Sequence, residues 1–396
     1  MVRKLPLSRL VLTMKNGTTA VQNQEKSGVP VTRIETISAG SIDLERVRYT
    51  KLDATEINRW RLLNGDILLS HINSVEHIGK SAIYSGNPDV LIHGMNLLLL
   101  RPDIKVVLPE YLHFALRSCG VRDHIRARCK RAINQASINQ KELGAIEILV
   151  PALDEQRRIV DLLSRAEGIV RLRRDAQKKA AGLIPAIFLN MFGDPATNPK
   201  GWPVQPLGEV ASFMSGGTPP KAREELWSGT LPWVSPKDMK VDCIADAIDH
   251  VSDSVLTETN LKLVPVGSVL IVVRGMILVH TVPIAITSRP VTINQDMKAL
   301  MSIKSIDPSF LLWALKVQHT KLLALVDTAA HGTKKLDTAK IQAVGIPVPP
   351  LQIQRQFIAR ADSVASIMAQ QDSALNKAKA TFEALLARSF TTEALA

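Results

Sequence analysis

Aromatic residues make up only 4% of this chain of 396 residues. Proteins that bind single-stranded nucleic acid commonly stack successive bases on aromatic side chains, so the composition does not favour that class. Cysteine is rarer still, because the chain has only Cys119, Cys129 and Cys243, an odd number without metal-ligand spacing. They indicate free thiols in a reducing cytoplasm rather than disulfides or a zinc site.

Long apolar runs are missing as well. The most apolar region, residues 261–286, is interrupted by Lys262, Arg274, His280 and two prolines, whereas a membrane-spanning helix needs about 18–20 uninterrupted apolar residues. The first residues, Met-Val-Arg-Lys-Leu-Pro, lack the apolar stretch of a secretory signal. We therefore expect a cytoplasmic protein without a membrane partner.

Familiar catalytic motifs do not occur. The sequence has no Asn-Pro-Pro-Tyr or Asp-Pro-Pro-Tyr motif of a methyltransferase, no Walker loop, no Gly-x-Gly-x-x-Gly, no His-Glu-x-x-His and no Cys-x-x-Cys. Residues 215–221 are rich in glycine, but their prolines and spacing do not form a phosphate loop. We expect no cofactor or metal to be bound by this chain.

Positive charge is abundant. The net charge is +12, and the isoelectric point is about 9.7. A globular chain this basic usually meets a polyanion, either nucleic acid or an anionic membrane surface. The plain alternative is charge that serves only solubility.

The two halves of the chain repeat each other. Residues 138–187 and 336–385 match at one constant offset of 198, without insertion or deletion. Earlier anchors match with slightly drifting offsets, while the loops between them differ. A period this long indicates a duplicated domain rather than a solenoid. Because His250, His280 and His331 have no counterparts in the first half, a duplicated catalytic site is not favoured.

Each half begins with about 150 residues of mixed character. Apolar runs at 66–70 and 269–273 are typical of strands, and residues 109–116 and 308–315 are expected to be helical. We predict an α+β fold with two similar mixed α/β domains and two long helices. The predicted boundaries are 1–150 for the first domain, 151–198 for a central helix, 199–348 for the second domain and 349–396 for a C-terminal helix.

Both long helices have apolar residues at alternating steps of four and three, the a/d seam of a coiled coil. The predicted seam residues are Ile159, Leu163, Ala166, Val170 and Arg173 in the first helix and Phe357, Ala361, Val364, Met368, Gln371 and Leu375 in the second. The simplest arrangement is an antiparallel coiled coil with approximate two-fold symmetry. The alternatives are that each seam packs on its own domain or on another subunit. Asp154 is the expected N-cap of the first helix, and Gly182 with Pro185 should kink or weaken its last turns.

Basic and polar side chains gather near the end of each mixed domain. Residues 117–131 carry six Lys/Arg against one acid, and residues 330–335 include the basic loop of the second half. Such groups neutralise phosphates and bond base edges, whereas the plain alternative is a solvated surface. The DNA-contact candidates are Arg126, Arg128, Lys130, Arg131, Asn134, Gln135 and Ser137 in the first half and Thr218, Lys221, Arg223, Lys237, Arg274, His331, Gly332, Thr333, Lys334 and Lys335 in the second.

These motifs resemble the specificity (S) subunit of type I restriction-modification enzymes. The resemblance rests on Gly217-Thr218-Pro219, on Gly332-Thr333-x-x-Leu336 and on a Pro-x-Leu-x-x-Gln segment that occurs twice, before each long helix, ending at Gln156 and Gln354. The first half departs from the pattern, with Gly17-Thr18-Thr19 and with residues 134–138 in place of the Gly-Thr forms.

The resemblance implies a non-catalytic, prokaryotic reader of double-stranded DNA. Each target-recognition domain would read one half of a bipartite, asymmetric site, with the helices as spacer. Two methyltransferase subunits, which carry S-adenosylmethionine, would dock on the helices, and motor-nuclease subunits using ATP and Mg would join through them. Alternatives are the S-type subunit of a related combined restriction-methylation enzyme, an enzyme with an unrecognised duplicated active site, or a basic coiled-coil scaffold without DNA specificity.

Overall fold

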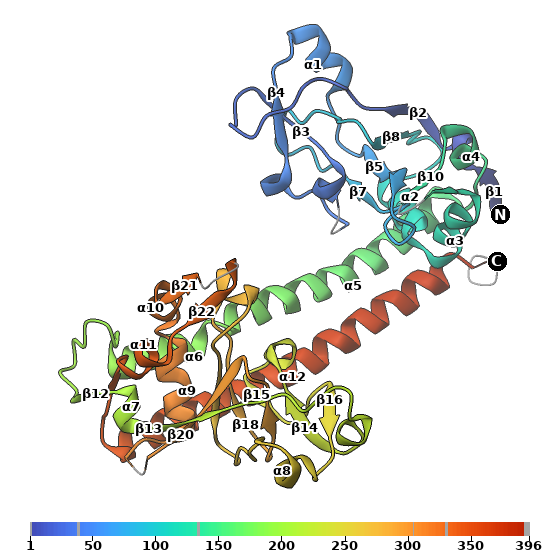
Figure 1. Cartoon of the computed structure of the whole chain (residues 1–396). Coiled ribbons are helices and arrows are strands. Elements are labelled where there is room, and N and C mark those ends of the chain that lie inside the picture. Colours follow the sequence, from blue (N-terminus) through green and yellow to red (C-terminus); the bar gives the residue numbers. More distant parts are fainter. Residues whose placement is uncertain (1, 38–39, 133–134, 304, 329–331, 392–396) are drawn as a thin grey trace. The chain divides into compact units, whose positions relative to one another are not determined.

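The computed structural model describes residues 2–37, 40–132, 135–303, 305–328 and 332–391 (Figure 1). The chain divides into two compact units. Unit 1 consists of Met1–Arg174 and Ser373–Ala396, and unit 2 of Asp175–Asp372. Unit 1 is therefore assembled from two separate pieces of sequence, whereas unit 2 is one continuous piece. Both borders between the units lie inside the long helices. Each long helix therefore begins in one unit and ends in the other.

Unit 1 contains a four-stranded sheet in the order β2-β8-β5-β7, a pair β1-β11, a three-stranded sheet β6-β10-β9 and a pair β3-β4, all antiparallel. The strands are β1 Arg3–Pro6, β2 Val11–Asn16, β3 Val29–Val31, β4 Arg48–Thr50, β5 Ile67–Ser70, β6 Ile72–Asn73, β7 Ser81–Ile83, β8 Leu97–Pro102, β9 Lys130–Ala132, β10 Gln135–Ser137 and β11 Glu147–Val150. The helices are η1 Leu7–Arg9, η2 Ile34–Ile37, η3 Leu44–Arg46, α1 Ala54–Trp60, α2 Pro109–Arg117, α3 Cys119–Arg128, α4 Gln140–Gly144 and the start of α5 Leu153–Ala180.

Unit 2 repeats this plan with additions. Its main sheet has the order β13-β20-β17-β18-β15, beside the sheet β16-β14-β19 and the pairs β12-β23 and β21-β22. The strands are β12 Val204–Pro206, β13 Ala211–Ser215, β14 Leu231–Val234, β15 Cys243–Ile244, β16 Asp249–Val251, β17 Val269–Val272, β18 Ile284–Thr287, β19 Thr292–Ile293, β20 Met297–Ser302, β21 Val326–Thr328, β22 Lys334–Leu336 and β23 Gly345–Pro347. The helices are α6 Leu183–Phe192, α7 Leu207–Val210, η4 Glu224–Trp227, η5 Pro236–Asp238, α8 Val255–Glu258, η6 Met276–Val279, α9 Pro308–Lys316, α10 His319–Ala324, α11 Thr338–Gln342 and the start of α12 Leu351–Ser389.

The two units share a scaffold. The strand order β2-β8-β5-β7 of unit 1 recurs as β13-β20-β17-β18 in unit 2, and each is followed by a helix, a hairpin and a strand that pairs with the unit's first strand. The strands predicted from residues 66–70 and 269–273 are β5 and β17, and the predicted helices are α2 and α9. These predictions, and the α+β fold with two similar domains, are confirmed.

Each long helix contributes its first turns to the core of the unit in which it begins, and α12 contributes its last turns to the core of the other unit. The core of unit 1 contains Ile159 and Leu163 from the start of α5 together with Phe382 and Leu386 from the end of α12. The core of unit 2 contains Phe357 and its neighbours from the start of α12 together with residues of α6 that follow α5: Ile184, Phe188 and Phe192. The start of one helical segment thus packs with the end of the other, which within each unit is an antiparallel arrangement.

The predicted seam is most deeply buried where each helix begins. The structure buries Ile159, Leu163, Phe357, Ala361 and Leu375, and it leaves Ala166, Val170, Arg173, Val364, Met368 and Gln371 half-buried. The expected kink near Gly182 is a break, because α5 ends at Ala180 and α6 begins at Leu183. Asp154 is not the N-cap of α5. The helix already begins at Leu153, so Asp154 lies in its first turn, where a carboxylate still favours the helix dipole.

Each long helix is joined to its mixed domain by one buried glutamine. In unit 1, Gln156 accepts a hydrogen bond from the Leu108 amide at 2.8 Å and donates to the carbonyls of Val106 at 3.1 Å and Pro151 at 3.0 Å. It is completely buried. One side chain therefore satisfies backbone groups from both the helix approach and the turn before α2, which fixes the helix to the domain.

Unit 2 has the same joint. Gln354, also completely buried, accepts from the Asp307 amide at 2.9 Å and donates to the carbonyls of Ser305 at 3.0 Å and Pro349 at 2.8 Å. We name Gln156 and Gln354 with these partners the glutamine joints. They explain physically why the Pro-x-Leu-x-x-Gln segment occurs twice. In the described part of the chain, no helix is both long and apolar enough to cross a membrane.

Candidate nucleic-acid interface

The basic segment of unit 1 forms a helix and a hairpin. Helix α3 buries Val121 and Ile125, four residues apart, and ends at Arg128, which is exposed. Strand β9 then pairs with β10, with Arg131 opposite Ala136 and Lys130 opposite Ser137. We name β9 and β10 the first hairpin. Ala136 is buried and ties β10 to the edge of β6, which imposes strand geometry on this segment.

The cations of this region are largely free of acidic partners. Arg128, Lys130 and Arg131 are exposed, and within the described ranges none of the three forms an ion pair. Arg126 is half-buried, with a carboxylate oxygen of Asp123 at 3.5 Å. Gln135 is exposed and Ser137 half-buried on β10, whereas Asn134 lies outside the described residues. The structure therefore brings the described first-half candidates together on one helix end and one hairpin.

Unit 2 has a matching hairpin with different chemistry. Strands β21 and β22, which we name the second hairpin, pair Thr328 with Lys334 and Asp327 with Lys335. The Lys334 ammonium donates to the Thr328 hydroxyl at 2.7 Å, and Lys335 lies 3.4 Å from a carboxylate oxygen of Asp337.

The residues before β22 position this hairpin. Gly332 has a φ of 77°, a left-handed conformation that glycine adopts readily. Thr333 follows it as a half-buried residue outside any regular element. His331 lies outside the described residues.

Arg274 joins the second hairpin from another part of the fold. It forms an isolated β-bridge with Lys335, and the neighbouring Gly275 amide donates to the Lys334 carbonyl at 3.0 Å. Its side chain is exposed, and among the described residues it has no ion-pair partner. Three of the predicted second-half candidates, Arg274, Lys334 and Lys335, are thus adjacent although about 60 residues separate them in sequence.

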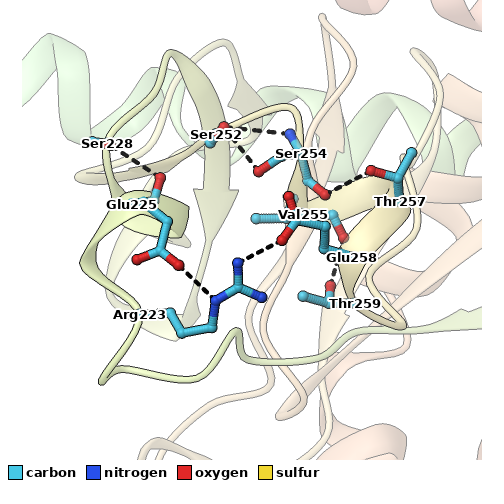
Figure 2. Close-up of polar contacts among 9 residues, drawn as sticks. All are labelled: Arg223, Glu225, Ser228, Ser252, Ser254, Val255, Thr257, Glu258 and Thr259. Atoms are coloured by element: carbon cyan, nitrogen blue, oxygen red, sulfur yellow. Dashed lines mark hydrogen bonds and ion pairs between the residues drawn. The ribbon is translucent and has the colours of Figure 1, made fainter.

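The other second-half candidates are held by local contacts. Figure 2 shows Arg223 between two carboxylates, with Glu225 at 2.6 Å and Glu258 at 2.5 Å. These hydrogen bonds, first that to Glu225, raise the pKa of Arg223. Lys237 pairs with Asp249 at 2.6 Å, and the Thr218 hydroxyl donates to the Gln295 side chain. Lys221 is exposed.

Arg223 and Lys237 therefore resemble Lys335, which pairs with Asp337, and differ from the unpaired cations of the two hairpin regions. Each is already neutralised by an acidic neighbour, so a phosphate would have to compete with a carboxylate for it. Among the described residues, Arg128, Lys130, Arg131 and Arg274 form no ion pair, although the charge of Arg128 contributes to lowering the pKa of Glu147, after Lys4. The described residues hold no cluster of histidine, cysteine and acidic side chains suited to a metal ion. What this arrangement offers is positive charge and amide or hydroxyl groups on two hairpins, one in each unit, the chemistry that bonds phosphates and base edges.

Sequence reasoning missed two features. One is the role of the glutamine joints, although their recurrence at one offset was a visible signal. The other is an exposed apolar turn beside the second hairpin, η6, where Met276, Ile277 and Val279 are 62%, 40% and 42% exposed. The sequence indicated this turn only by a run of apolar residues that lacks the apolar-polar alternation of a half-buried strand. Only the structure shows that the turn is exposed rather than buried.

Comparison with known proteins adds a family to this geometry. The family described as type I restriction modification DNA specificity domain matches residues 11–180 and 199–377. A chain from Methanocaldococcus jannaschii named as the type I restriction enzyme MjaX specificity subunit is 32% identical over 393 residues, which is 94% of this chain and 89% of that relative. The EcoR124I/EcoR124II specificity subunit of Escherichia coli is 31% identical over 153 residues, 38% of each chain.

Solved structures share the fold. A chain from a structure of the type I R-M system, determined to explain complex assembly and conformational transition, has a TM-score of 0.63 at 20% identity, covering 99% of this chain and 98% of the other. The type I restriction-modification S subunit from M. genitalium has a TM-score of 0.54 at 16% identity, covering 99% and 96%.

Proposed function

Because this chain belongs to the specificity subunits of type I restriction-modification systems, a family of non-catalytic DNA-recognition subunits, we propose that its two units read the two halves of a bipartite, asymmetric site in double-stranded DNA. The observation that carries the proposal is one scaffold with two unlike hairpins. Equal scaffolds would approach DNA in the same manner, and unlike side chains would select different bases. An asymmetric pair of half-sites follows.

The hairpins supply the electrostatic part of this proposal. In unit 1, Arg128, Lys130 and Arg131 are exposed and, in the described chain, unpaired; in unit 2, Arg274 and the two lysines of β22 lie together. Each phosphate that such a side chain neutralises releases counterions, so affinity should fall steeply with salt. The polar neighbours Gln135, Ser137 and Thr333 are the proposed base readers, because amides and hydroxyls bond base edges.

The long helices have two roles in the proposal. A helix of 39 residues such as α12 is about 58 Å long at 1.5 Å per residue, more than one DNA turn of about 34–36 Å. We propose that the helices set the unread spacer and that two methyltransferase subunits dock along them. Motor-nuclease subunits would join through the methyltransferases, and S-adenosylmethionine, ATP and Mg would be bound by those partners.

Methylome sequencing tests the function directly. In cells that express this chain with its methyltransferase partner, a bipartite adenine-methylated motif should appear, and it should vanish when the chain is omitted. A scaffold without DNA specificity would leave the methylome unchanged. The absence of any motif that depends on this chain would refute the proposal.

The spacer role has its own experiment. One heptad inserted after Arg174 and another after Asp372, the borders between the units, should lengthen the unread spacer and leave both half-sites unchanged. A heptad in α12 alone is the matched control, because it shifts one seam against the other and should abolish specific methylation. Altered half-sites with a constant spacer would contradict the division of labour between hairpins and helices.

The hairpin role is tested by salt dependence. Lys130→Ala or Arg131→Ala should reduce the slope of log K against log salt for DNA binding by the methyltransferase complex by about 1 each. Lys105→Ala, an exposed lysine before α2 near the glutamine joint, is the control and should leave the slope unchanged. Equal slopes for all three variants would remove the first hairpin from the interface.

A further inference from the structure

The turn η6 in unit 2 exposes three large apolar side chains within four consecutive residues. Met276, Ile277 and Val279 are 62%, 40% and 42% exposed, while Leu278 between them is buried. The buried leucine anchors the turn, and the Leu278 amide donates to the Gly275 carbonyl at 3.2 Å. The three exposed side chains are therefore held outward on a fixed turn. We name Met276, Ile277 and Val279 the apolar tip.

The apolar tip is physically tied to the second hairpin. Gly275 donates to the Lys334 carbonyl at 3.0 Å, and Leu336 donates to the Val273 carbonyl at 2.9 Å. These bonds bracket the bridge between Arg274 and Lys335. The apolar tip thus follows directly after a strand end whose side is lined by cations.

Unit 1 has the same connection with a polar turn. Strand β6 pairs with β10 through Asn73 and Ala136, as the residues before η6 pair with β22, and the turn that follows is Ser74-Val75-Glu76-His77. Only Val75 of these is a large apolar residue, at 37% exposure. The two units therefore differ in the side chains of this turn, whereas the strand pairing next to the turn is the same in both.

Charge indicates what covers the apolar tip. Arg274 is exposed and unpaired among the described residues, and the lysines of β22 lie next to it. An apolar surface bordered by cations fits a polyanion that also displays apolar groups. In the major groove of DNA the C5-methyl groups of pyrimidines are such groups, and apolar side chains contact the thymine methyl.

We propose that the apolar tip reads C5-methyl groups of pyrimidines in the half-site of unit 2, while Arg274 and the second hairpin hold the adjacent phosphates. This inference rests on the proposed function, because it presupposes that unit 2 reads a half-site. It assigns that half-site a chemistry: at least one thymine, or a 5-methylcytosine in its place, lies under Met276 or Ile277.

The experiment removes single methyl groups from the DNA. The half-sites are first taken from the methylome, and the complex of the full chain with its methyltransferase is then bound to duplexes in which one thymine at a time is replaced by deoxyuridine. A thymine under the apolar tip should lose about fourfold in affinity, the equivalent of ~0.8 kcal/mol for one buried methyl group. Substitutions in the half-site of unit 1 serve as the internal reference.

Variants locate the effect on the protein. Met276→Ser and Ile277→Ser should weaken binding to the thymine duplex and abolish the difference between thymine and deoxyuridine. Val266→Ser, which alters a residue that is 58% exposed and precedes β17, should leave that difference intact. A second arm replaces cytosine by 5-methylcytosine at each position of the half-site, and a gain that Ile277→Ser removes would identify 5-methylcytosine as the methyl source.

The outcomes separate the two proposals. Loss of all sequence-specific binding by the wild-type complex would refute the proposed function. If the complex binds specifically but removing methyl groups from the second half-site changes nothing, only the proposed role of the apolar tip is overturned. The same holds if the apolar-tip variants fail to associate with the methyltransferase while the dependence on the DNA methyl group persists. In that last case the apolar tip would be a protein contact.

Discussion

At matching positions, unit 1 carries Arg117 and unit 2 carries Lys316. The Arg117 guanidinium lies 5.5 Å and 5.4 Å from the ring centroids of Phe114 and Phe382, and it pairs with Glu167 at 2.7 Å. It thereby covers the place where the end of α12 meets α2. The cavity at this place measures about 190 Å³.

The same place in unit 2 is open. Lys316 lies 4.9 Å from the Trp313 ring and pairs with Asp242, while Ala365 stands where unit 1 has Glu167 and Ile184 where it has Phe382. The smaller side chains leave an apolar groove of about 710 Å³ lined by Ile184, Trp313, Ile358, Ala361, Ala365 and Met368. The groove of unit 2 thus combines smaller side chains on the long helices with lining from Asp242 and Cys243 at the added strand β15.

The glutamine joints show the opposite behaviour, because every hydrogen bond of Gln156 has its counterpart at Gln354. The two units are alike where the direction of a helix is fixed and unlike where a surface faces a partner or solvent. The geometry of the helix joints and the chemistry of the surfaces therefore vary independently in this molecule.

We expect the largest loss of stability from substitutions in the glutamine joints, and the two losses show whether the joints are equivalent. Gln156→Leu and Gln354→Leu should each lower the free energy of unfolding of their unit by about 3 kcal/mol or more, since each leaves one buried amide and two carbonyls without partners. Urea unfolding measures the loss. Gln356→Leu, an exposed glutamine in the same turn of α12, is the control and should cost little. A large cost in one unit only would break the equivalence of the joints.

The next effect concerns acid sensitivity, which should separate the units. Burial lowers the pKa of His113 to about 3, and the positive charge of Arg117 contributes to this shift. Burial also lowers the pKa of His93 to about 4. Lys15 and His71 lower it further, whereas the hydrogen bond to the Leu97 carbonyl and the charge of Asp66 act in the opposite direction. Unfolded histidine takes up a proton near pH 6.5. Between these pKa values and pH 6.5 the unfolded state binds more protons than the folded state. The free energy of unfolding of unit 1 therefore has its full value above about pH 6.5 and falls as the pH is lowered.

The expected slope is up to about 1.4 kcal/mol per pH unit for each histidine. Hydrogen exchange in α2 and α9, measured from pH 7 to 5, should show α2 losing protection first, because unit 2 has Leu312 in place of His113. His113→Leu should reduce the pH dependence of unit 1. Equal acid sensitivity of both helices would contradict this assignment.

The smallest effect sharpens the contrast between the closed and open surfaces. Arg117→Ala removes contacts with two rings and an ion pair, and we expect a loss of about 1–2 kcal/mol. Lys316→Ala removes one ring contact and one exposed pair, so about 0.5 kcal/mol is expected. Thermal unfolding of both variants checks the ratio. Equal losses would mean that the ring contacts of Arg117 contribute nothing.

The sequence was most informative where the two copies could be laid on each other. The repeated Pro-x-Leu-x-x-Gln segment located both long helices, and the apolar runs of β5 and β17 located the central strands, because buried strands need continuous apolar residues. The three-residue strands of the hairpins escaped prediction, since so short a segment has no measurable period and is shaped by its pairing partner. Arg274 could not be placed beside Lys335, because that bridge joins residues about 60 positions apart.

The division of unit 1 into two pieces has a consequence for synthesis on the ribosome. Residues up to Arg174 emerge first, but the end of α12, which supplies Phe382 and Leu386 to the same core, follows about 200 residues later, or about 10–40 s at 5–20 residues per second. During that interval Ile159 and Leu163 lack the partners that α12 supplies to their core, while unit 2 needs only the residues that have just been made. The unit begun first is therefore finished last, and the nascent chain is most vulnerable to aggregation and most in need of chaperones before its final helix leaves the exit tunnel.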